Sequence, residues 1–155
     1  MTRMFVFTAG NRNARQHLKD SIERPVDPKT VFGTFPEHQR ERLQKVYERG
    51  SGFYAWGAIL GRDNTPNWQA MEPGDFALCV YGATYQYVCR VIAKYDNEQF
   101  AETVWKKNDK GQTWQLMYFL TELLRWAVVC PSLGTTSSLI GIGASPTSRT
   151  REPKI

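Results

Sequence analysis

Two β-rich runs in the middle of the chain constrain its fold more than any other feature. Residues 76–81 and 85–95 are rich in β-branched and aromatic side chains, and only three residues, which include Gly82, separate them. A connection this short joins antiparallel neighbours, because parallel strands need a crossover of a dozen or more residues. The two runs therefore predict a β-hairpin. A Pro-Gly-Asp turn sequence at 73–75 leads the chain into the first of them.

Short strand and helix patterns alternate along the rest of the chain. The continuous apolar run at 4–8 is typical of a buried strand, and residues 12–22 carry Ala14, Leu18 and Ile22 at helical spacing. One further helix is predicted from Thr34 to a stop at Gly50, and another from a cap at Asp96 or Asn97 as far as Val104. Further strands are predicted at 53–60, 114–120 and 126–129. Residues 61–67 are predicted to form a polar loop, and the segment around Glu122 is undecided. This mixture predicts the α+β class, with a curled β-sheet or small β-barrel flanked by two or three helices.

Length and charge bound the function. A chain of 155 residues is about one domain, and 20 Lys and Arg against 15 Asp and Glu give a net charge of +5, which favours an acidic partner. We assign residues 1–130 to this domain. Residues 131–155 are rich in Ser, Thr and Gly and hold no aromatic side chain, so we expect them to form a poorly ordered tail.

Cysteine usage and hydropathy indicate the compartment. Cys79, Cys89 and Cys130 lie in apolar segments, where cysteine usually behaves as a small buried hydrophobe. The apolar stretch at the amino terminus is too short for a signal peptide, and no apolar run is long enough to span a bilayer. We therefore expect a cytoplasmic protein that does not enter a membrane.

Motifs for catalysis, metal binding and cofactor binding are absent from the sequence. It contains no nucleophile elbow, no phosphate-binding loop and no Cys/His spacing for zinc. His17 and His38 fall on the polar faces of predicted helices, where a surface role is far commoner than catalysis. The sequence thus predicts a non-catalytic protein without cofactor or metal, in which any nuclease or NTPase activity would come from another domain or chain.

Aromatic side chains beside polar loops indicate a binding site instead. Tyr54 and Trp56 alternate with period two, so they share one face of their predicted strand. Gly57 would let another backbone or a ligand approach closely. Trp105 opens a basic loop at 106–110, and rings next to cations suit nucleic acid, because phosphates supply affinity and rings stack on bases. The alternative is that the rings fill the core and the lysines are solvated.

Several segments follow one another in a particular order: FVFTAGN, FYAWGA, GRDNTPNW, MEPGD, the hairpin, NEQFAETVW and KGQTWQLMYFL. This order resembles the EVE and YTH branch of the PUA-like superfamily, and it looks closest to the amino-terminal reader modules of modification-dependent restriction enzymes of the Mcr type. The resemblance covers about residues 4–120. Its MxPGD element is widespread, whereas AlaTrpGly combined with VW and GxTW is more particular.

The resemblance implies a curled β-barrel flanked by helices that flips a modified base into an aromatic cage. It implies Trp56 as one wall and Trp105 as the second, with Asn11 and Asn64 in polar contact with the base. The full candidate set for the base is Trp56, Trp105, Tyr54, Trp68, Asn11 and Asn64, and the set for the phosphates is Arg12, Arg15, Arg62, Lys106, Lys107 and Lys110. Trp114 and Trp126 lie in apolar runs, and we expect them in the core.

The sequence therefore predicts a DNA-binding module that recognises a methylated or hydroxymethylated base for a restriction or defence system, with a separate nuclease or motor subunit as its partner. Three alternatives stay open: an RNA-binding domain of the PUA or ASCH kind, an enzyme that processes a nucleoside or base, and a structural role. The tail after Leu124 departs from the family's closing strand, and the sequence has no counterpart of the motor and nuclease parts of a restriction system.

Overall fold

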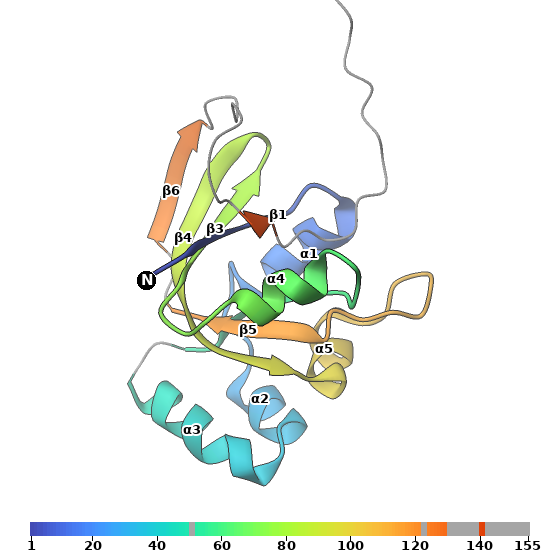
Figure 1. Ribbon diagram of the computed structural model, residues 1–155. Helices are drawn as coiled ribbons and strands as arrows, with labels where there is room; N and C mark the ends of the chain where they lie inside the picture. The colour runs from blue at the N-terminus through green and yellow to red at the C-terminus, as the bar shows by residue number, and fades with distance from the viewer. Residues whose placement is uncertain (50–51, 122–123, 130–139, 142–155) are drawn as a thin grey trace, which may run out of the picture.

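The computed structural model of the protein describes residues 1–49, 52–121, 124–129 and 140–141. These residues form seven strands and five helices (Figure 1), in the order β1 Met4–Thr8, α1 Arg12–Ser21, α2 Pro28–Thr34, α3 Glu37–Glu48, β2 Tyr54–Ala58, α4 Asn64–Ala70, β3 Phe76–Tyr81, β4 Thr84–Asp96, α5 Glu98–Trp105, β5 Leu116–Leu120, β6 Leu124–Val129 and β7 Ile140–Gly141.

All strands belong to one curled sheet in the order β2-β5-β4-β3-β1-β7, with β6 also paired to β4. The long strand β4 produces the curl, since its first part pairs with β3 and β6 and its last part pairs with β5. The register shifts between Val91 and Ala93 and between Tyr85 and Tyr87, and such irregularities bend and twist a strand. β1 runs parallel to β3 and β7. The predicted α+β class, the curled sheet and the β3–β4 hairpin are confirmed.

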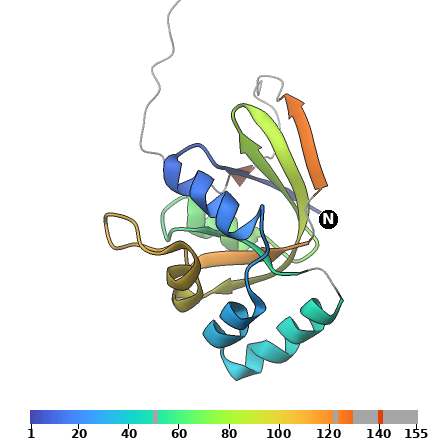
Figure 2. The same ribbon diagram turned by 180° about the vertical axis from the view of Figure 1, so that it is seen from behind.

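Both faces of the curled sheet are covered. Successive residues of β5 alternate between two hydrophobic clusters, with Tyr118 in the first cluster and Met117 and Phe119 in the second. The first cluster includes residues of β1 and α1, and the second includes residues of α2, α3 and α5. Figures 1 and 2 show α1 and α4 on one side of β5, with α2 and α3 on the other. Because β5 is buried on both faces, every one of its residues is buried.

Asparagine caps set the starts of the two helices that build the site described below. The side chain of Asn11 accepts a hydrogen bond from the backbone N–H of Ala14 at 2.8 Å, and the side chain of Asn97 accepts one from Phe100 at 2.9 Å. Such caps satisfy backbone donors that have no partner within the helix. The helix predicted at 12–22 and the cap predicted at Asn97 are confirmed.

The prediction of two or three helices is too low, because the described residues contain five. α2 was not predicted: its start is stabilised by the side chain of Asp27, which accepts from the backbone of Lys29, and by Pro28 in the first turn. α4 lies largely where a polar loop was predicted, and none of its residues is buried. The following helix begins at Glu37 rather than at Thr34, since Thr34 instead ends α2.

The predicted strand at 114–120 begins two residues late, at Leu116, and the predicted strand at 126–129 lies within β6. The side chain of Trp126 and the segment around Glu122 lie outside the described residues. Of the predicted tail, only residues 140–141 are described, and they pair with β1. The boundary between domain and tail therefore stays a prediction.

Cys79 and Cys89 are buried and not joined in a disulfide, as expected, and Cys130 lies outside the described residues. Burial raises the pKa of Cys79 to about 12. None of the helices in the described ranges combines the length and apolar character needed to cross a membrane. The same ranges hold no group of three or more His, Cys, Asp or Glu side chains placed to bind a metal ion.

Candidate base-binding cavity

A cavity of about 410 Å³ lies between α1 and the carboxyl end of α5. Its polar side comes from α1, where residues at i, i+3, i+4 and i+7 share one helix face: Asn13, Gln16, His17 and Asp20. Residues 104–107 and Trp114 form the other side. The fold thus brings α1 together with residues 104–114, which lie far from it in the sequence.

His17 is the most buried polar residue of this cavity, with 5% of its surface exposed. Its ring centroid lies 4.2 Å from that of Trp114, edge to face, and 5.7 Å from that of Trp105. Burial lowers the pKa of His17 to about 4, although the Asp20 carboxylate and a hydrogen bond to the backbone of Trp105 act in the opposite direction. The imidazole is therefore neutral at neutral pH.

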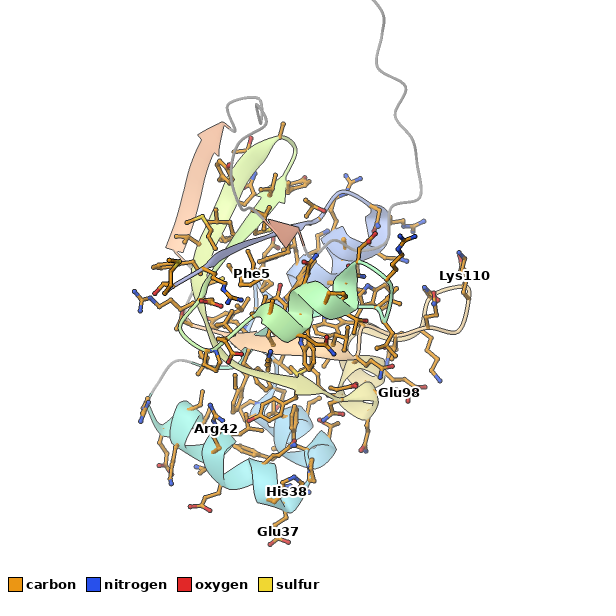
Figure 3. All side chains as sticks on the ribbon, viewed as in Figure 1. Phe5, Glu37, His38, Arg42, Glu98 and Lys110 are labelled. Atoms are coloured by element: carbon orange, nitrogen blue, oxygen red, sulfur yellow. The ribbon has the colours of Figure 1, made fainter. Side chains whose placement is uncertain are left out.

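The prediction that His17 lies on the surface is wrong. It follows Ala14 by three residues, so it borders the apolar stripe of α1 instead of standing opposite to it. That spacing could have identified it. His38, the other histidine, is exposed on α3, as predicted (Figure 3).

Trp105 is held rigidly at the edge of the cavity. It is 4% exposed, and its indole N–H donates to Oγ of Ser21 at 3.0 Å. The Ser21 hydroxyl in turn lies 2.7 Å from the carbonyl oxygen of Ala55, to which it donates. This chain of hydrogen bonds links α5, α1 and β2, so it orients the indole ring.

Gly57 lies against two walls of the cavity. A Cβ at this position would stand 2.5 Å from Cζ3 of Trp105 and would overlap the carbonyl oxygen of Trp114. A larger residue would therefore push both tryptophans out of place. The predicted close approach of another backbone to Gly57 is confirmed.

Trp56 is placed in the core and not among the residues that line the cavity. It is 1% exposed, and its ring centroid lies 4.6 Å from that of Phe7. The His17 ring lies near both predicted cage walls, with its centroid 6.3 Å from that of Trp56 and 5.7 Å from that of Trp105, and Trp56 exposes too little surface to border an open gap. The two indoles therefore do not face each other across an open gap. The physical reason is that position 56 points into the first hydrophobic cluster.

Tyr54 and Trp68, the other aromatic candidates, pack against the same cluster and do not line the cavity. Tyr54 and Trp56 share one face of β2, as predicted. The indole N–H of Trp68 donates to the carbonyl oxygen of Met117 at 3.1 Å, and Nζ of Lys94 lies 5.0 Å from its ring centroid.

The predicted amides serve the backbone. Asn11 caps α1, and Nδ2 of Asn64 donates to the carbonyl oxygen of Ile59 at 2.9 Å. Neither lines the cavity, whereas Asn13 and Gln16 do. The sequence does not single out Asn13 and Gln16, because their placement depends on which face of α1 meets α5.

Two of the six predicted phosphate contacts lie at the cavity, Lys106 and Lys107. Nζ of Lys107 is 3.3 Å from a carboxylate oxygen of Glu102. Lys110 lies at the projecting tip of the loop between α5 and β5 (Figure 3). Arg12, Arg15 and Arg62 are exposed but are not part of the cavity lining.

Comparison with solved structures finds a similar fold in the N-terminal domain of Thermococcus gammatolerans McrB bound to m5C DNA. The TM-score is 0.58 at 13% sequence identity, and the match covers 81% of this chain and 78% of that one. At this identity the likeness is one of fold, and it agrees with the predicted resemblance to reader modules of Mcr-type systems. No protein-family model matches the sequence, and no curated protein matches it.

Proposed function

We propose that this chain is a DNA-binding module that receives a modified base, flipped out of the duplex, in the cavity between α1 and α5. The observation that carries this proposal is the composition of the cavity. It combines two indoles, a neutral imidazole and two amides with a pair of lysines at its edge. Its volume of about 410 Å³ falls in the usual range for small-ligand sites.

The energetics are compatible with base flipping. Extruding a base costs a few kcal/mol, and stacking on an aromatic side chain contributes about 1 to 3 kcal/mol per base. A methyl group on the base adds about 0.8 kcal/mol when buried. Stacking and burial together can therefore offset the extrusion cost.

Full stacking requires a movement of the loop between α5 and β5, since Trp105 and Trp114 each expose only 4% of their surface. This loop is held mainly by bonds among its own residues. Oδ1 of Asn108 accepts from the backbone of Lys110 and Gln112, and the Thr113 hydroxyl donates to the carbonyl oxygen of Lys106. Because Trp105 and Trp114 both belong to the second hydrophobic cluster, exposing their ring faces to a base would break part of their core contacts.

The charges at the cavity suit a phosphate backbone. Lys106 and Lys107 lie at its edge, Lys110 extends from the same loop, and Arg12 and Arg15 are exposed on α1. Such cations give affinity and orientation, whereas the cavity reads the base. We include Arg62 in this phosphate-binding set as well. Trp56 contributes indirectly, because its ring packs against the His17 ring.

The fold likeness to a domain bound to m5C DNA adds support for a role in a restriction or defence system. We propose no catalytic role. A separate nuclease or motor subunit would act on the DNA that this module binds.

The test is a titration of duplexes that carry 5-methylcytosine, 5-hydroxymethylcytosine, N6-methyladenine or no modification. We expect one modified duplex to bind more tightly, and equal affinities would contradict the proposal. Trp105→Leu should remove the preference, whereas Trp68→Leu, which alters an indole outside the cavity, should keep it. Circular dichroism checks that both variants fold. Tighter binding of structured RNA than of any duplex would favour an RNA-binding domain instead.

A further inference from the structure

The polar side of the cavity contains one carboxylate, Asp20. It lies seven residues after Asn13 and three after His17, on the α1 face that lines the cavity. Within the described residues, the only side chain that donates a hydrogen bond to it is Gln16, through Nε2 to Oδ1 at 3.0 Å. No hydrogen bond to the second oxygen, Oδ2, is formed among the described residues.

Among the described residues, neither lysine of the cavity forms an ion pair with Asp20. Lys107 forms an ion pair with Glu102 at 3.3 Å, and Nζ of Lys106 donates to the carbonyl oxygen of Thr103 at 3.3 Å. His17 is neutral, because burial lowers its pKa to about 4. The base would therefore meet a carboxylate that can only accept hydrogen bonds.

This matters because 5-methylcytosine and thymine carry the same methyl group at C5. They differ at position 4, where cytosine has an amino donor and thymine has a keto acceptor, and at N3, which accepts in cytosine and carries a proton in thymine. Stacking on the indoles and burial of the methyl group act equally on both bases. A reader of methylated cytosine that makes no hydrogen bond to this edge of the base would also accept the thymine of every A·T pair.

We propose that Asp20 is the residue that determines base specificity, by accepting a hydrogen bond from the exocyclic amino group of the flipped base and opposing the keto oxygen of thymine. The inference rests on the proposed function and names the class of base that the cavity takes, one that bears an exocyclic amino group. Gln16 holds the Asp20 carboxylate in place through its hydrogen bond to Oδ1.

The experiment measures binding of two duplexes that differ only in the target base, 5-methylcytosine or thymine. The target stands opposite an abasic site, so that its extrusion breaks no base pair. We expect the wild-type chain to bind the 5-methylcytosine duplex roughly tenfold more tightly, the size of discrimination that one good base contact gives. Asp20→Asn should reduce this ratio by about fivefold or more, since its amide can also donate to a keto oxygen.

Asp63→Asn is the matched control. Asp63 is exposed at the start of α4 and makes no side-chain cap hydrogen bond, so its replacement removes the same charge away from the cavity. We expect it to change both affinities equally and to preserve the ratio. Thermal unfolding checks that both variants fold.

Two results would overturn the inference while the proposed function stands. The first is a wild-type chain that prefers 5-methylcytosine to unmodified cytosine but binds thymine equally well. The second is an Asp20→Asn chain that keeps the full preference for 5-methylcytosine over thymine. A wild-type chain that shows no preference for any modified duplex would instead contradict both proposals.

Discussion

At the scale of single residues, His17 shows how burial changes chemistry. Its imidazole is enclosed by Trp105, Trp114 and Trp56, with 5% of its surface exposed. Burial of the ring disfavours the charged form. His17 therefore serves as a neutral aromatic element of the cavity, and Asp20 remains free of an ion pair with it.

A pH dependence of stability follows from this burial. The pKa of His17 falls from its ordinary value of 6.5 to about 4 in the folded chain, so the unfolded chain binds a proton first as the pH decreases. The contribution of His17 to the free energy of unfolding is fully present above about pH 6.5, decreases as the pH falls towards about 4, and does not change further below that. The loss from this one group is roughly 3 kcal/mol. Urea unfolding of the wild type and of His17→Gln at several pH values measures it.

We expect His17→Gln to lose stability less steeply over this interval than the wild type. His38→Gln is the control, because His38 is exposed on α3, and its pH profile should follow that of the wild type. Parallel profiles for wild type and His17→Gln would contradict the buried, neutral state of His17.

At the scale of elements, α5 depends on two hydrogen bonds made by the side chain of Asn97. Oδ1 of Asn97 caps the helix by accepting from Phe100 at 2.9 Å, and Nδ2 donates to the carbonyl oxygen of Thr34 at 3.1 Å. One side chain thus starts α5 and ties it to the end of α2. Since residues 104–107 line the cavity, this tie also positions the binding site.

Asn97→Ala should lower the free energy of unfolding by about 1 kcal/mol for the lost cap, and further for the lost bond to Thr34. Asn97→Asp keeps the capping oxygen and loses only the donor to Thr34, so we expect a smaller decrease. Urea unfolding at neutral pH measures both. Equal stability of Asn97→Ala and the wild type would show that the cap contributes nothing.

The accuracy of sequence-based prediction also varies between elements. β1 and the β3–β4 hairpin were predicted to within a residue or so, because strong β propensity and turn residues act locally. α4 was missed because it has no buried residue and so leaves no apolar periodicity. α2 was missed because it is short and begins with Pro28, a residue that ends helices elsewhere but that the first turn of a helix tolerates.

At the scale of the whole molecule, the curled sheet separates two hydrophobic clusters and leaves the cavity at the edge where α1 and α5 meet. Lys106 and Lys107 line this cavity, and Lys110 extends from the same loop (Figure 3). Binding of DNA across this region should therefore depend on salt through those lysines.

Lys107→Ala should weaken binding to modified and unmodified duplexes alike. The slope of log K against log salt concentration should decrease by about 0.9, the value for one lost phosphate contact. The control is Lys45→Ala on α3, because Lys45 is also an exposed lysine paired with a carboxylate at 3.3 Å, that of Glu41. It should leave the slope unchanged. Equal slopes for all three chains would exclude Lys107 from the phosphate contacts.

The α+β class, the curled sheet with its central hairpin, the basic character and the abundance of aromatic residues can be predicted from the sequence, because they depend on local periodicity and composition. Which ring meets the cavity depends on how the elements pack. β2 and β5 are buried on both faces, so period-two alternation cannot distinguish a side chain that faces a core from one that faces a site. Trp56 consequently packs in the core, whereas Asp20, His17, Trp105 and Trp114 meet at the cavity from positions up to 97 residues apart because α1 packs against α5.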